Sequence, residues 1–187
     1  DNNASVFATE VAPLLNQGAR VALVVVDALR YEVALSLVKS LQNFAPKLKP
    51  ACAVLPTITT VGKASLLPGG ESLSIDVDYK TNSITPKIGG TAIQSVDDRM
   101  KFLRGQFGDR FKQMSTKEFL PKKPSEFAKT DFLCLRYDDI DETLETETSS
   151  MFDAISRGVQ HVSQVVRRIA ACLLYTSDAA DDTPCVD

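Results

Sequence analysis

Two short segments contain the residue types that a metal site with a nucleophile requires. In the first segment, RVALVVVDALRYE, an apolar run ends abruptly in Asp27. In the second, LPTITTVGKASLLPG, a proline and three threonines open a short helical pattern. A carboxylate binds divalent cations, and a hydroxyl becomes a good nucleophile when a metal or a base lowers its pKa. The two segments together therefore predict a metal site with a hydroxyl nucleophile.

Asp27 follows the apolar run 21–26, which is typical of a strand buried on both faces of a parallel sheet. A carboxylate in that position is costly to desolvate unless it binds a cation, bonds to a helix N-terminus or reaches solvent. The alternative to a metal ligand is an N-cap of the helix that follows. The nearby threonine segment makes us favour the metal role.

The threonine segment offers three candidate nucleophiles, Thr57, Thr59 and Thr60. At a helix start, backbone N–H groups and the helix dipole would favour a bound phosphate. The alternative is that one of these threonines only caps the helix. Arg30 and Lys63 are candidate phosphate contacts, although Arg30 also suits an exposed or ion-paired helix position.

A third acidic group follows the apolar run 132–137, where the chain reads Asp138, Asp139 and Asp141. Clustered carboxylates after a strand can bind hard or borderline cations. Glutamates follow directly, so a solvated acidic loop is an equally good interpretation.

The pattern of apolar residues predicts strands that alternate with amphipathic helices, which is typical of an α/β fold with a mostly parallel sheet and helices on both faces. A β-hairpin, inserted or at the sheet edge, is expected from 72 to 88, and an exposed loop over 117–129. The expected helices are 6–15, 29–44, 60–67, 97–107 (capped by Ser95) and 151–171, and the expected strands are 21–26, 51–55 and 132–137.

Composition narrows the classes of function. The net charge of −3 gives no reason to expect nucleic-acid binding, and no apolar run approaches the roughly 18 residues of a membrane span. No GxxxxGK[ST] and no strand-linked GxGxxG is found. Cys52 and Cys134 are expected to be buried, reduced thiols of a cytoplasmic protein.

The two ends of the sequence are unusual. The first residues lack an initiator Met, so we expect the chain to begin inside a longer protein. The last sixteen, CLLYTSDAADDTPCVD, break the strand–helix pattern. We therefore expect a partial domain over 1–171 and a non-native or disordered tail over 172–187.

The hexapeptide DALRYE from Asp27, the turn LPTITT from Leu55 and the later RYDDID from Arg136 resemble the PglZ family. That family belongs to the alkaline-phosphatase-like superfamily of metal-dependent phosphatases and phosphodiesterases and is associated with bacterial phage defence. The resemblance covers roughly residues 18–171. It implies a phosphate-ester substrate, two divalent metals, zinc being expected, and partners among defence-system proteins.

The resemblance also implies roles for individual residues. Asp27 would bind one metal, and Asp141 would bind the second. Thr59, the second threonine of P-T-x-T, would be the nucleophile and would bridge toward the metals. The superfamily completes its site with a downstream Asp-His pair and a further His. This sequence has no Asp-His-Gly segment, and its only histidine is His161, for which we expect a surface or boundary position. The site is thus about half present, and we expect the chain by itself to be inactive.

Two other functions are compatible with the sequence. A non-catalytic module of a defence complex would keep the fold in order to bind a partner. A receiver-like domain would use Asp27 as a phosphoacceptor, but a receiver also carries acidic residues near the end of its first strand, and none occurs in 21–26.

Overall fold

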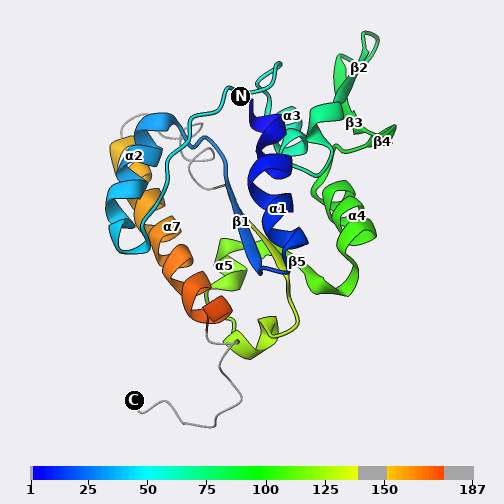
Figure 1. Ribbon diagram of the computed structural model, residues 1–187. Helices are drawn as coiled ribbons and strands as arrows, with labels where there is room; N and C mark the ends of the chain where they lie inside the picture. The colour runs from blue at the N-terminus through cyan, green and yellow to red at the C-terminus, as the bar shows by residue number, and fades with distance from the viewer. Residues whose placement is uncertain (1, 139–150, 175–187) are drawn as a thin grey trace. The chain divides into compact units, whose positions relative to one another are not determined.

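The structure is a computed structural model that describes residues 2–138 and 151–174. The chain forms two compact units. Figure 1 labels the helices and strands that belong to them. Among the described residues, unit 1 comprises 2–25, 49–113 and 131–134, and unit 2 comprises 26–48, 114–130, 135–138 and 151–174. Each unit is described below by itself.

The main sheet has three parallel strands in the order β1-β6-β5, which are Val21–Val26, Phe132–Tyr137 and Phe111–Ser115. The Val21 N–H donates to the Asp131 carbonyl at 2.7 Å and the Asp27 N–H donates to the Tyr137 carbonyl at 3.0 Å. The two bonds advance in the same direction along both strands, which is the parallel arrangement. The predicted α/β class with a parallel sheet is confirmed.

A second, antiparallel sheet contains the predicted hairpin. Strands β2 (Ser74–Asp78), β3 (Ser83–Ile88) and β4 (Thr91–Ala92) lie in the order β2-β3-β4. Gly89 and Gly90 connect β3 to β4 with φ of 56° and 81°, the left-handed conformations that a two-residue hairpin turn requires. The hairpin is therefore a separate sheet rather than an edge of the parallel one.

The helices of unit 1 surround an aromatic core. The rings of Phe7, Phe107, Phe111 and Phe132 meet with centroid distances from 5.1 to 6.4 Å. Ser95 caps α4 through a capping box with Asp98, as predicted. The helical segments of this unit are η1 (Asn3–Ser5), η2 (Phe7–Val11), α1 (Ala12–Asn16), α3 (Thr59–Ser65), η4 (Gly70–Ser72), α4 (Val96–Phe107) and η5 (Gly108–Arg110).

Unit 2 is organised around the long helix α7 (Met151–Leu174), which contacts α2 (Tyr31–Ser40), α5 (Thr116–Phe119) and η6 (Pro124–Phe127). A further short turn, η3 (Gln42–Phe44), follows α2. Tyr137 and Val162 are the buried centre of an apolar cluster that Val26, Leu37 and Val166 extend. The helical period predicted for 151–171 is confirmed.

Two predicted elements are wrong. Residues 51–55 form no strand: Cys52 makes only an isolated bridge with Asn2, and the Asn3 side chain accepts the Val54 N–H at 3.0 Å. The run is bounded by prolines and pairs with the N-terminal segment, which leaves Cys52 exposed, contrary to prediction, whereas Cys134 is buried as predicted.

The segment 117–129 is not an exposed loop. It contains α5 and η6, and the rings of Phe119 and Phe127 are fully buried against each other at 5.3 Å. Most lysines and prolines of this segment are exposed. The two buried phenylalanines anchor the segment in the core of unit 2. Composition averaged over the segment concealed these anchors.

Helix α7 continues through Leu174, and Cys172 is buried within it. Residues 175–187 are outside the part of the chain that the structure describes, so the proposed tail stays a prediction. Over the described residues, none of the helices combines the length and the apolar character needed to cross a membrane.

Candidate functional site

Asp27 lies immediately after β1, in the turn that leads to α2. Its backbone N–H continues the ladder to Tyr137, and its Oδ1 accepts the Ala28 N–H at 3.1 Å. Ala28 has a φ of 55°, an uncommon left-handed conformation for a residue with a side chain. This turn holds the half-buried carboxylate at the carboxyl end of the strand.

The N-cap alternative for Asp27 is wrong. Helix α2 begins at Tyr31, its N-cap residue is Arg30, and no side chain makes a capping hydrogen bond there. The sequence predicted a start at Leu29, but the left-handed Ala28 and the extended Arg30 delay it. Asp27 is therefore not the N-cap residue of α2.

Asp138 follows β6, the strand beside β1. Because Asp27 bonds to the carbonyl of Tyr137, the two aspartates follow neighbouring parallel strands at the same end. Asp138 is half-buried, and its Oδ2 lies 3.8 Å from Nη1 of Arg136. Unit 2 thus places two carboxylates at one edge of the sheet, where ligands of open α/β sheets bind.

Thr59 is the first residue of α3 and is exposed. The N-cap residue is Ile58, and no side chain caps this helix, so the capping alternative is also wrong for the threonines. Thr57 is exposed and Thr60 is half-buried. Within the described residues, the helix start leaves the Thr59 hydroxyl free of a capping role.

The two candidate phosphate contacts differ in setting. Arg30 is exposed at the start of α2, and its carbonyl accepts the Ala34 N–H at 3.0 Å. Lys63 lies in the last turn of α3 and is half-buried. Both assignments stay predictions.

The predicted site residues divide between the units. Asp27 and Arg30 belong to unit 2, whereas Thr59 and Lys63 belong to unit 1. Asp141 falls outside the described residues, as does its rival Asp139. The convergence of Asp27, Thr59 and Asp141 on one site therefore stays a prediction.

Metal binding can be tested against the donor groups in residues 2–138 and 151–174. No three His, Cys, Asp or Glu side chains in that part of the chain lie together as a metal site. Asp27 and Asp138 supply oxygen donors from adjacent strand ends, which suits a hard or borderline divalent cation but leaves its coordination incomplete. The described donors thus fit part of a metal site.

Two features near this edge were not anticipated. Arg136 has a buried Nε with no hydrogen-bond partner among the described residues, although it lies beside Asp138. His161 stacks on Tyr137 at 4.6 Å, and its Nε2 lies 2.9 Å from the Thr116 hydroxyl. His161 is half-buried, at the boundary position that the sequence predicted. Strand alternation could have signalled Arg136, because it lies two residues before Asp138 and side chains two apart along a strand point to the same side.

The parallel sheet, the separate hairpin and the surrounding helices are consistent with an alkaline-phosphatase-like domain. A family model described as the BREX system PglZ alkaline phosphatase-like domain matches residues 6–178, which is most of the chain. The chain therefore belongs to the PglZ family, and it is a phosphatase-like domain associated with phage defence. No curated protein matches this sequence. Alkaline-phosphatase-like proteins are generally metal-dependent.

Proposed function

We propose that this chain contributes Asp27, Thr59 and Asp141 to the active site of a metal-dependent phosphatase or phosphodiesterase. The observation that carries the proposal is the position of Asp27. Its carboxylate stands at the carboxyl end of β1 beside the end of β6, and it does not cap α2. Asp138 at the neighbouring strand end supports an oxygen-rich metal site and is the rival to Asp141.

Each residue has a defined task in the proposed reaction. Asp27 and Asp141 would hold two divalent cations, for which zinc is our choice, with further ligands from a downstream Asp-His segment. Bound cations would lower the pKa of a nearby hydroxyl and balance the charge on the attacking and leaving oxygens. The Thr59 hydroxyl would give its proton to solvent and its oxygen would bond to phosphorus, while the P–O bond to the ester's alcohol breaks and the alcohol leaves with a proton from solvent. Water would then hydrolyse the Thr59–phosphate bond and restore the hydroxyl. Arg30 and Lys63 would bind the remaining phosphate oxygens.

The test is metal analysis combined with hydrolysis of bis(p-nitrophenyl) phosphate. It uses a longer protein in which this chain is continued by the family's Asp-His segment. We expect bound zinc and turnover that a chelator abolishes. Asp27→Asn should reduce both bound metal and turnover, because the amide loses the charge that binds the cation.

The control is Asp109→Asn, at an exposed aspartate of η5 that precedes the amino end of β5, whereas Asp27 follows the carboxyl end of its strand. This change should alter neither quantity. The 187-residue chain alone should show little or no turnover, because its only histidine contacts Tyr137 and Thr116. A folded longer protein with no metal and no turnover would instead favour the non-catalytic, partner-binding module.

A further inference from the structure

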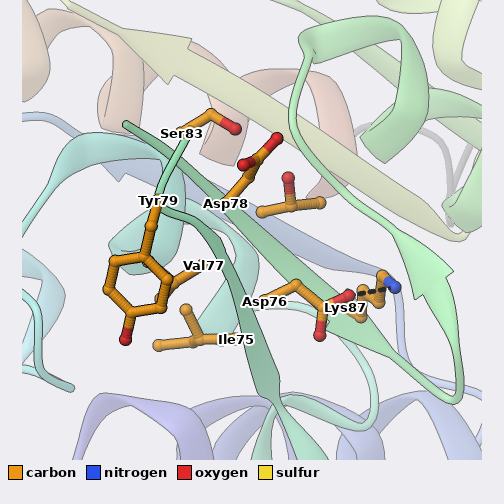
Figure 2. A pocket seen from close by; sticks show the side chains of 8 residues that line it. Ile75, Asp76, Val77, Asp78, Tyr79, Ser83 and Lys87 are labelled. Carbon is orange, nitrogen blue, oxygen red and sulfur yellow. Dashed lines mark hydrogen bonds and ion pairs between the residues drawn. The ribbon is translucent and has the colours of Figure 1, made fainter. Parts of the chain in front are cut away.

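The hairpin of unit 1 has one polar and one apolar face. Antiparallel pairing places directly opposed residues on the same face, and successive residues alternate between faces. Figure 2 shows Asp76 with its partner Lys87 apart from Ile75, Val77 and Tyr79. The opposed pairs on the polar face are Ser74 with Lys87, Asp76 with Thr85 and Asp78 with Ser83, and those on the apolar face are Ile75 with Pro86 and Val77 with Ile84.

The backbone of β2 has one free edge, because β2 is the outer strand of the order β2-β3-β4. The Pro86 carbonyl accepts the Ile93 N–H at 2.8 Å, so the peptide groups of Pro86 face the β4 side. Its partner Ile75 must then direct its own N–H and C=O away from β3, and so must Val77, two residues further on. The outward donors and acceptors of β2 therefore belong to Ile75 and Val77.

The hairpin is anchored through β3, whereas the end of β2 nearest the turn is exposed. Ile88 is buried in the unit 1 core, and β3 contacts α3. In contrast, Val77 is 46% exposed and Tyr79 is 86% exposed. An open groove of about 730 Å³ is lined by residues 75–79 and by the polar-face residues Ser83, Thr85 and Lys87 of β3. A firmly anchored hairpin thus presents free backbone groups beside exposed apolar side chains.

We propose that the free edge of β2 binds an extended segment of a partner protein in which Lys or Arg alternates with apolar residues. The added strand would bond to the backbone of Ile75 and Val77, as in other cases of strand addition. Its apolar side chains would cover Val77 and Tyr79, and its cations would lie beside Asp76 and Asp78.

Charge decides against a second copy of the same chain. Two β2 edges paired antiparallel and centred on Asp76 or on Val77 would bring Asp76 opposite Asp76 or Asp78, and like charges directly opposed are destabilising. β2 itself contains two carboxylates and no cation, and the Asp76 side chain remains 61% exposed although it pairs with Lys87. A basic strand removes the repulsion that a second copy would create.

The first experiment uses the 187-residue chain and a fluorescent seven-residue peptide that alternates Lys and Val, with a Glu–Val peptide for comparison. We expect the basic peptide to bind at least tenfold more tightly and to slow amide exchange at Ile75 and Val77. Val77→Pro removes an outward N–H but no bond to β3, so it should weaken binding about tenfold. Val77→Thr keeps the N–H and is the matched control, with binding close to wild type.

A second pair of variants keeps the proposal testable if Val77→Pro does not fold. Asp76→Asn and Asp78→Asn remove charge and keep a side-chain acceptor, including the one that binds the Lys80 N–H. Together they should abolish the preference for the basic peptide. Equal binding of the two peptides to the wild-type chain, or no binding of the basic one, would overturn the proposal. So would unchanged binding in a folded Val77→Pro chain. A wild-type dimer that Val77→Pro dissociates would show instead that a second copy occupies the edge.

Discussion

Replacing Gly70 with alanine should destabilise unit 1, because no space exists for the added methyl group. A Cβ at this position would lie 2.0 Å from the Ser65 carbonyl oxygen and 3.1 Å from the Ala4 carbonyl oxygen. Both are backbone atoms, and ordinary contact begins at 3.4 Å. The segment after α3 must therefore move by more than 1 Å from the end of the helix that carries Thr59.

The expected cost is at the upper end of the 1–3 kcal/mol typical of overpacking, because no flexible side chain can yield. For a chain of this length, about 2–3 kcal/mol corresponds to a melting temperature about 5–10 °C lower. Gly105→Ala is the matched control. It lies inside α4 with no atom near the added Cβ, so the same substitution should stabilise by about 0.5–1 kcal/mol.

Both variants would be compared with wild type by urea unfolding and by thermal scans. The reasoning predicts opposite signs for one and the same chemical change. Gly70→Ala with wild-type stability would show that the close approach to Ser65 does not exist in solution.

Two further predictions concern the core and a helix cap. Phe132→Ala should cost about 3–5 kcal/mol of unfolding free energy, because Phe132 is 1% exposed at the centre of the aromatic cluster, whereas Leu55→Ala, at a 76% exposed site, should stay within about 0.5 kcal/mol. Hydrogen bonds from the Ser95 backbone N–H and hydroxyl lower the pKa of Asp98 below its ordinary value of 3.8. The capping box should therefore stabilise the fold above that value and lose its contribution as the pH falls through the lowered pKa. Urea midpoints measured against pH should show this acid-side loss in wild type and a smaller one in Asp98→Asn, and equal losses would contradict the cause given for the shift.

Elements with strong local patterns could be predicted from the sequence. The run VALVVV gives β1, the helical period after Met151 gives α7, and Ser95 with Asp98 gives the start of α4. Strand β5 was missed because FKQMS has neither an apolar run nor a clear alternation. Its place beside β6 depends on contacts between distant segments, and no local pattern contains that information.

The candidate site shows the same limit. A strand end at Asp27 is a local feature, so it could be predicted. Whether Asp27 caps α2 depends on where the helix begins, and the left-handed Ala28 moves that start to Tyr31. The choice of Thr59 as nucleophile is similarly sensitive, because a shift of one residue would select a neighbouring threonine. In the structure α3 begins at Thr59, after the N-cap residue Ile58.

The most direct test of the proposed function is the rate of phosphodiester hydrolysis by Thr59→Ala in the longer, zinc-loaded protein, measured beside Thr57→Ala. Both threonines are exposed, and neither caps α3, so neither change should move the urea midpoint appreciably. The account predicts that Thr59→Ala lowers turnover by about three orders of magnitude or more while Thr57→Ala stays near wild type. Full activity in Thr59→Ala, or a loss confined to Thr57→Ala, would contradict it.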